Sequence, residues 1–276
     1  MRYLKLSALL ALCLAVLSCK SQYEVLLASG DLDAKYEAAM NYFDLKKYQK
    51  AAQLFESMAV LTSGTERDDT VQYYWGLSNY RYKDFYTAES NFSRFIQNFP
   101  RSPFTPEAEF YRLDCLYRAT YRWELDQTPT RSCMAAIMEF IRERPDDVHV
   151  PVCREMLTDL MDRLDRKDFE AGKLYYKMED YPAARIKLQN VLKNNADNGY
   201  REEVLYYTAM SSYHYARLSV VKKQKERYLT FVDDYLNFVG EYPESKHRSE
   251  MDRLYRQVQK ILGRGGEVEE TSNLKK

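Results

Sequence analysis

The sequence has few of the residues that interrupt helices or build catalytic sites. Its 276 residues include only 9 glycines, 8 prolines and 3 histidines. Scarce glycine and proline favour a helical protein. The histidines are isolated, with no HExxH motif and no second ligand at metal-binding spacing, and there is no GxSxG motif, phosphate-binding glycine loop or dinucleotide fingerprint. We therefore expect a protein that is not an enzyme and that holds neither a metal nor a cofactor.

The charge balance and the cysteines say little for a nucleic-acid partner or for a cysteine-based site. Basic and acidic residues are equal in number, 41 of each, so nothing indicates a nucleic-acid partner. No CxxC pair is present, and beyond the N-terminal segment only Cys115, Cys133 and Cys153 remain. Three thiols cannot all pair with one another. We interpret them as small buried hydrophobic residues, and a disulfide between two of them stays open.

The N-terminal segment has the layout of a lipoprotein signal peptide. Arg2 and Lys5 precede an apolar run over residues 6–17, which is too short to span a membrane as a mature helix. No later stretch is long and apolar enough to do so. Residues 16–19, Val-Leu-Ser-Cys, resemble the bacterial lipobox, in which the cysteine is acylated and becomes the mature N-terminus. We predict a signal peptide over 1–18 and a linker over 19–30 that begins at lipidated Cys19, which anchors the chain. An ordinary secretory signal is the alternative.

A pattern with a period near 37 residues runs through the rest of the chain. Three positions of the first unit recur 37 residues later, where Tyr48, Ala51 and Phe55 become Phe85, Ala88 and Phe92. A fixed period in a helical sequence indicates stacked hairpins that share one core. The spacing suits a small residue where two helices cross and a large apolar residue one turn later. We therefore predict an all-α fold, a right-handed α-solenoid of about five tetratricopeptide-like helical hairpins with a C-terminal capping helix.

The repeat sets the expected domain boundaries. The repeat domain covers 31–262, with units at about 32–67, 68–103, 104–147, 160–198 and 200–246 and a cap at 249–262. A tail over 263–276, with three glycines and several charges, is predicted to be disordered. A generic helical bundle is the alternative. The coincidence of alanine, phenylalanine and proline across the units argues against it.

Short segments point to one family of repeat proteins. Trp75-Gly76 and Ala171-Gly172 stand where tetratricopeptide repeats have a large apolar residue and a glycine. The segment LDQTPT at 125–130 precedes a second helix, and FPRS at 99–102 and YPES at 242–245 close second helices. Together with the lipobox and the length, these segments resemble the BamD family of lipoproteins. The resemblance implies a non-catalytic subunit of the outer-membrane β-barrel assembly machinery on the periplasmic face of the outer membrane. The implied partners are a BamA-type barrel subunit, unfolded outer-membrane proteins and further lipoproteins of that machinery.

Tyrosine is abundant, with 25 copies. The concave surface of a helical solenoid binds extended or helical peptides, and tyrosine offers such peptides both apolar area and a hydroxyl. The candidates for the N-terminal half of this groove are Tyr36, Tyr73, Tyr74, Tyr80, Tyr111 and Tyr117. Packing between helices is the alternative for each of them.

Two basic groups are candidates for the partner interface, because the resemblance implies that the C-terminal repeats contact the BamA-type subunit. One group is Arg185 and Lys187, which we expect to be exposed on the second helix of the fourth unit. The other is the run Lys222, Lys223, Lys225 and Arg227. A run of charge on a helical hairpin is commonly solvated surface, and that alternative stays open. A functional run would meet an acidic protein surface or an anionic lipid headgroup.

Two other functions remain from the sequence. The chain could be a cell-envelope adaptor lipoprotein that recruits peptidoglycan enzymes or a division factor through its repeats. It could also be a nutrient-binding lipoprotein of the outer membrane. The chain lacks the large non-repeat region of such proteins, and Lys20-Ser21-Gln22-Tyr23 stands where surface export favours an acidic run.

Overall fold

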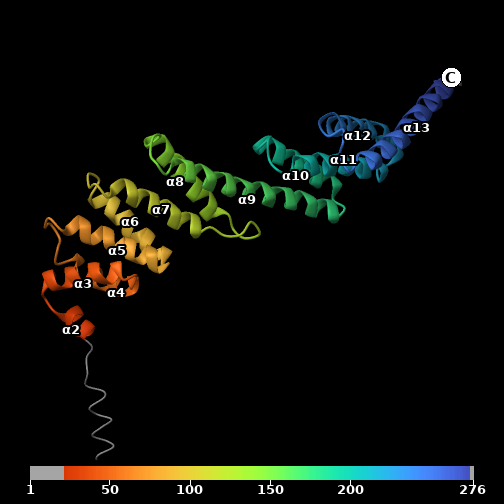
Figure 1. Cartoon of the computed structure of the whole chain (residues 1–276). Coiled ribbons are helices and arrows are strands. Elements are labelled where there is room, and N and C mark those ends of the chain that lie inside the picture. Colours follow the sequence, from red (N-terminus) through yellow and green to blue (C-terminus); the bar gives the residue numbers. More distant parts are fainter. Residues whose placement is uncertain (1–21, 274–276) are drawn as a thin grey trace, which may run out of the picture. The chain divides into compact units, whose positions relative to one another are not determined.

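The computed structural model describes residues 22–273, with side chains to Gly263. Over these residues every regular element is an α-helix, as Figure 1 shows, and the predicted all-α fold is confirmed for this part of the chain. The predicted signal peptide, the lipidation site Cys19 and the last three residues lie outside it. The predicted linker already contains a helix, α2 (Gln22–Ala28). Its residues Tyr23, Leu26 and Leu27 pack against a hydrophobic cluster that includes Ala51 and Phe55.

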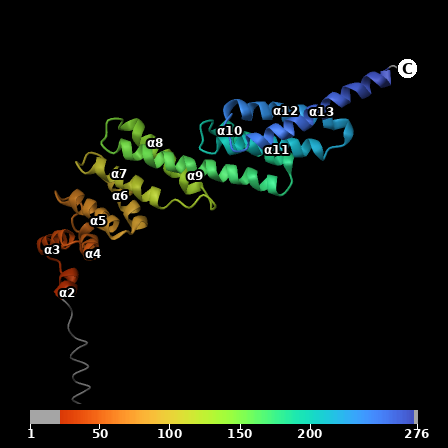
Figure 2. The same cartoon turned by 45° about the vertical axis from the view of Figure 1, so that its right-hand side comes forward.

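The chain divides into two units, and the first contains the residues up to Thr120 together with Thr128–Cys153. After α2 it holds three hairpins, which fall in the first three predicted repeat units. Their helices are α3 (Leu32–Asp44), α4 (Tyr48–Ala59), α5 (Asp68–Tyr82), α6 (Phe85–Asn98), α7 (Thr105–Arg118) and α8 (Thr128–Glu143). Each of these helices contacts the next from α3 to α8, and Figures 1 and 2 show the hairpins stacked in chain order.

The second unit contains Tyr121–Gln127 and the residues from Arg154 onward. Most of α9 (Val150–Lys177) belongs to it, followed by α10 (Tyr181–Asn194), α11 (Arg201–Arg217), α12 (Val221–Glu241) and α13 (Arg248–Asn273). Two bounds differ from the sequence prediction. The helix α9 begins in the gap left between the third and fourth units, and α13 continues beyond residue 262. Glycine lowers helix propensity by about 1 kcal/mol, which explains why the glycines after 262 suggested an end there.

The residues that define the repeat form the cores of both units. Small and large apolar positions of the pattern are fully buried, namely Ala51, Phe55, Ala88, Phe92, Ala184 and Leu188. Glycine allows the closest approaches. A Cβ atom on Gly76 of α5 would lie 3.0 Å from Phe92 Cε1, and one on Gly172 of α9 would lie 2.7 Å from Leu188 Cδ2. The paired helices therefore pack at distances that a larger residue would not allow.

Three of the hairpin turns have the same backbone geometry. Lys46, Lys83 and Glu179 adopt left-handed conformations, with φ of 58°, 70° and 63°. In each turn the following amide donates to the carbonyl five residues earlier, over 2.8 to 3.0 Å, as in a Schellman motif. Glycine is the usual residue at this position, and another residue costs about 1 kcal/mol there. Lys46 and Lys83 are 37 residues apart, which is the period of the repeat.

The residue after each left-handed position is the N-cap of the next helix. Asp84 and Asp180 cap α6 and α10, where their carboxylates accept the amides of Thr87 and Ala183 at 3.1 and 3.2 Å. Lys47 stands at the same place before α4 and makes no such bond. A missing N-cap costs about 1 kcal/mol, and a cation at a helix N-terminus opposes the helix dipole. The first turn is therefore the least favourable of the three.

Candidate functional site

Two half-buried tyrosines of the first unit, Tyr80 of α5 and Tyr111 of α7, lie in contact. Their ring centroids are 4.6 Å apart, and the Tyr80 hydroxyl donates to Asp114 Oδ2 at 2.7 Å. Asp114 is buried and also pairs with Arg118. Burial, followed by the bond to Asp114, raises the pKa of Tyr80 to about 12, and burial raises the pKa of Tyr111 as well. Both phenols therefore remain neutral hydrogen-bond donors at physiological pH.

Tyr74 and Tyr36 continue this set of half-buried rings on α5 and α3. The Tyr74 ring meets the Phe43 ring edge to face, with centroids 5.2 Å apart, and the Arg67 guanidinium lies 5.1 Å from the centre of the Tyr36 ring. All six predicted groove tyrosines lie on the first helices of the three hairpins, and these four are half-buried. We call Tyr36, Tyr74, Tyr80 and Tyr111 the tyrosine set.

The other two candidates differ. Tyr73 is only 3% exposed, and its ring stacks on Phe104 with centroids 4.5 Å apart, so it is a core residue and the groove prediction is wrong for it. Tyr74, the next residue of α5, is half-buried. Tyr117 is half-buried near the end of α7, where its carbonyl accepts the Thr120 hydroxyl at 2.6 Å.

The segment that carried the family resemblance begins in a loop fixed on α9, within the second unit. The Lys167 ammonium donates to the carbonyls of Trp123, Glu124 and Leu125 over 2.7 to 3.3 Å. Buried Gln127 donates to the Arg122 carbonyl at 2.8 Å. The side chains of Lys167 and Gln127 therefore hold the loop through hydrogen bonds to its backbone carbonyls.

The first pair of predicted interface cations is engaged inside the second unit. Arg185 of α10 makes two hydrogen bonds to Asp234 of α12, at 2.8 and 3.0 Å, and one to Ser212 of α11 at 2.9 Å. The Asp234 side chain is only 8% exposed. Lys187 pairs with Asp168 of α9 at 2.6 Å. The expectation that Arg185 is exposed is therefore wrong. The sequence did not reveal its pairing, because Asp234 follows 49 residues later on another helix.

The second group begins α12. Lys222, Lys223 and Lys225 are exposed, and Lys223 pairs with Glu226 at 3.4 Å. Arg227 is half-buried, with its guanidinium 3.9 Å from the centre of the Tyr215 ring. Three lysines of this run therefore face solvent, and its arginine packs on the protein.

An aromatic cluster of the second unit was missed by the sequence analysis. The rings of Tyr176 and Tyr207 are 5.1 Å apart, and Tyr181 stacks on His214 at 4.9 Å. The signal was present, since Tyr176 follows Gly172 by four residues, as Tyr80 follows Gly76. Two further phenols donate to carboxylates, Tyr206 to Glu250 at 2.9 Å and Tyr235 to Asp252 at 2.7 Å. Burial, followed by the bond to Asp252, raises the pKa of Tyr235 to about 12.

The cysteines and histidines offer little reactive chemistry. Cys115, Cys133 and Cys153 are all buried, and burial raises the pKa of Cys115 to about 12 and that of Cys153 to about 11. Thiols of this kind are poor nucleophiles. Each histidine stacks on an aromatic ring, for example His149 on Phe110 with centroids 3.9 Å apart. Within the part of the chain that the structure describes, no three His, Cys, Asp or Glu residues form a metal site.

Residues 30–228 match a family model described as YfiO, an outer membrane lipoprotein. The chain belongs to this family. The match covers more than half of the chain and includes residues of both units, so the resemblance to BamD-type lipoproteins is confirmed. Membership in the YfiO family makes the chain an outer membrane lipoprotein. None of the helices described between residues 22 and 273 is both long and apolar enough to cross a membrane.

Solved structures give weaker likenesses. One is a TPR repeats protein from Bacteroides fragilis NCTC 9343, with 14% identity and a TM-score of 0.41 over 84% of this chain and 100% of that one. Another is the TPR2AB domain of yeast Sti1 in a pHSP90 complex, with 12% identity and a TM-score of 0.40 over 83% of this chain and 98% of that one. A search of curated proteins gives no match.

Proposed function

We propose that this YfiO-family protein is a non-catalytic subunit of the outer-membrane β-barrel assembly machinery. It is anchored by acylated Cys19 at the periplasmic face of the outer membrane, holds a BamA-type barrel subunit and receives unfolded outer-membrane proteins. The observation that carries the proposal is the family match over residues 30–228. We assign the half-buried tyrosines of the first unit to the client and the exposed lysines of α12 to the barrel subunit.

The tyrosine set suits an unfolded client. Its rings are half-buried, so they are held by the protein and still offer an apolar edge. Aromatic rings at binding surfaces contribute apolar area and hydrogen bonding at a small cost in side-chain entropy. Unfolded outer-membrane proteins alternate apolar and polar residues, and such a segment in extended form presents one apolar face to the rings.

The surface proposed for the barrel subunit contains fewer residues than the sequence predicted. Arg185 and Lys187 are paired within the second unit, so the proposal rests on the first turns of α12. Lys222 and Lys223 are exposed there, and a cluster of exposed cations attracts an acidic protein surface and speeds association.

Affinity purification of the full-length protein from detergent-solubilised membranes tests the assignment. We expect to recover a large β-barrel protein with periplasmic domains. Lys222→Glu with Lys223→Glu should reduce its yield about tenfold, whereas Lys177→Glu with Lys193→Glu, also exposed and in the same unit, should not. Recovery of peptidoglycan hydrolases without a barrel protein would favour the adaptor function and reject this one.

Photocrosslinking tests the client surface separately. A photoreactive phenylalanine at Tyr36 or Tyr111 should crosslink to unfolded outer-membrane proteins during their synthesis, and one at exposed Tyr86, outside the set, should not. Equal crosslinking at Tyr86 would show that clients do not select the tyrosine set.

A further inference from the structure

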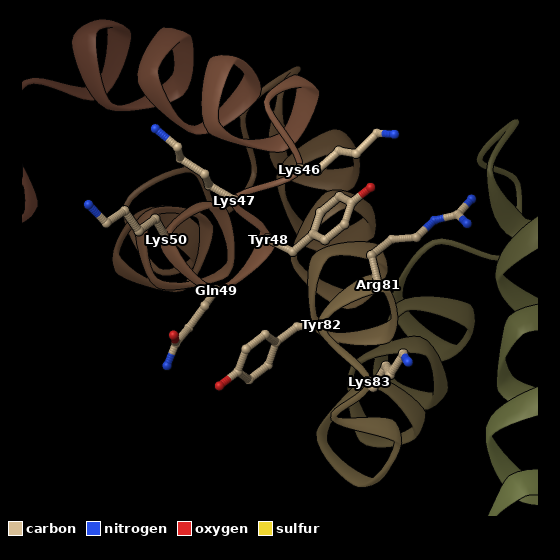
Figure 3. Close-up of a pocket in the computed structure, with 8 residues that line it drawn as sticks. All are labelled: Lys46, Lys47, Tyr48, Gln49, Lys50, Arg81, Tyr82 and Lys83. Carbon is tan, nitrogen blue, oxygen red and sulfur yellow. The ribbon is translucent and has the colours of Figure 1, made fainter.

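The turns that join α3 to α4 and α5 to α6, with the adjoining helix ends, line an open basic pocket in the first unit, with a volume of about 400 Å³. Five cations line it: Lys46, Lys47, Lys50, Arg81 and Lys83. Figure 3 shows the phenol rings of Tyr48 and Tyr82 between Lys47 and Lys50 on one side and Arg81 and Lys83 on the other. Five positive charges around one cavity attract an anion and repel one another without it.

None of these five cations forms an ion pair with a carboxylate of the described residues, although other cations of the same unit do. Arg67 pairs with Asp33 at 2.5 Å, and Arg112 pairs with Glu89 at 3.1 Å. All five are exposed. Lys47, Lys50 and Arg81 lie over aromatic rings, such as the Tyr23 ring, 5.0 Å from Lys50 Nζ. The positive charge of the pocket is therefore available to a ligand.

Lysine is an unfavourable residue at three backbone positions of the pocket. Lys46 and Lys83 occupy the left-handed positions of their turns, where glycine is easier to accommodate. Lys47 stands at the N-cap position before α4, where Asp84 and Asp180 cap the corresponding helices. Residues kept in unfavourable conformations cluster at functional sites. A ligand that selects cations accounts for lysine at three positions where stability alone favours glycine or aspartate.

The pocket adjoins the start of the described chain. The Tyr23 hydroxyl of α2 lies 2.8 Å from Gln53 Oε1 and 3.0 Å from the Lys50 carbonyl, so α2 is held against α4 beside the pocket. Cys19 precedes Gln22 by three residues, which span at most about 11 Å when fully extended. If Cys19 is the lipid anchor, as the proposed function holds, the pocket lies next to the membrane surface.

We propose that the basic pocket binds the anionic phosphate headgroups of the membrane in which Cys19 is anchored. Clusters of four or more cations beside a membrane anchor attract anionic lipids, and a second attachment strengthens an acyl anchor. The cavity has the size of ligand pockets that hold small molecules. Headgroup binding fixes the orientation of the first unit on the membrane, because a single point of attachment allows rotation and two attachments do not.

Lysine acetylation measured by mass spectrometry tests the pocket residue by residue. The full-length processed protein is reconstituted in vesicles of phosphatidylcholine alone or with about one third phosphatidylglycerol. In the anionic vesicles we expect Lys46, Lys47, Lys50 and Lys83 to react at least fivefold more slowly at about 0.1 M salt, with most of this protection lost at 1 M salt. Exposed Lys177 and Lys193 of the second unit should react equally in both vesicles.

Charge reversal gives a matched comparison. In Lys46→Glu with Lys47→Glu and Lys83→Glu, the remaining Lys50 should react at the same rate in anionic and neutral vesicles. The control Lys177→Glu with Lys193→Glu and Lys260→Glu removes as many exposed cations from the second unit and should keep the protection of Lys50. Circular dichroism of both variants verifies that the helices are intact.

Three outcomes would overturn the proposal. Equal protection in neutral and anionic vesicles would mean that the headgroup charge is not recognised. Equal protection by millimolar inorganic phosphate in detergent would mean a site for a small free anion, and equal protection by a polyglutamate peptide would mean a site for an acidic protein segment. The mass of the N-terminal peptide shows separately whether Cys19 is acylated. An unmodified Cys19 would contradict the proposed anchoring, and anionic vesicles without an effect on acylated protein would contradict the pocket alone.

Discussion

Two groups of cations, one in each unit, differ in how their charge is paired. In the second unit, Arg185 and Lys187 of α10 reach carboxylates on neighbouring helices. In the first unit, the five cations of the basic pocket have no carboxylate partner among the described residues. A basic residue in a repeat therefore indicates a binding surface only where the packing leaves it unpaired.

The largest effect is expected at the buried pair of the second unit. Arg185→Ala leaves the Asp234 carboxylate buried with only the Ser212 hydroxyl, and we expect the free energy of unfolding to fall by about 3 kcal/mol. Lys187→Ala breaks a pair whose partners are each about one third exposed, so the loss should be below about 1 kcal/mol. Urea denaturation measures both. Equal losses would mean that the Arg185 pair is as well solvated as a surface pair.

A smaller difference is expected between the two close helix contacts. Gly172→Ala places a methyl group 2.7 Å from buried Leu188, and overpacking of this kind costs about 2 kcal/mol. Gly76→Ala meets the Phe92 ring at 3.0 Å, and alanine recovers about 1 kcal/mol of helix propensity. We therefore expect Gly76→Ala to change the free energy of unfolding by less than about 1 kcal/mol. A larger loss for Gly76→Ala than for Gly172→Ala would contradict the packing distances.

The smallest change concerns the turns. Lys47→Asp should stabilise the protein by about 1 kcal/mol, because the carboxylate caps α4 as Asp84 caps α6. Asp180→Lys should destabilise it by a similar amount. Lys47→Ser supplies a cap without negative charge and separates capping from the helix dipole. If Lys47→Asp has no effect on thermal unfolding, the first turn is not the compromise between folding and binding that we infer.

Much of the fold could be predicted from the sequence because the residues that repeat are those of the core. The recurrence of Tyr48, Ala51 and Phe55 after 37 residues predicted the first two hairpins, and Gly76 and Gly172 predicted the close contacts. The start of α9 could not be predicted, since residues 148–159 lack the alanine and phenylalanine signal. Neighbouring repeats share a pattern of buried positions, and a helix that joins them does not need that pattern.

The surface residues were harder to predict. Which of Tyr73 and Tyr74 is buried depends on the rotation of α5 by one residue. The pairing of Arg185 depends on Asp234, 49 residues later. The unpaired state of Lys46, Lys47 and Lys83 is visible only when two turns 37 residues apart are brought together. The role of Cys19 remains a prediction, because it lies outside the described residues.

The hydrogen bonds from tyrosine to carboxylate set a limit on the conditions the fold tolerates. Tyr80, Tyr206 and Tyr235 each hold their proton between two oxygens, and removing it would place two anions side by side. Their pKa values are raised, so between pH 10 and about 12 the folded chain keeps protons that the unfolded chain releases. Stability is therefore lost as the pH rises through this range. Alkaline unfolding should therefore begin with the deprotonation of these phenols, which lie in both units.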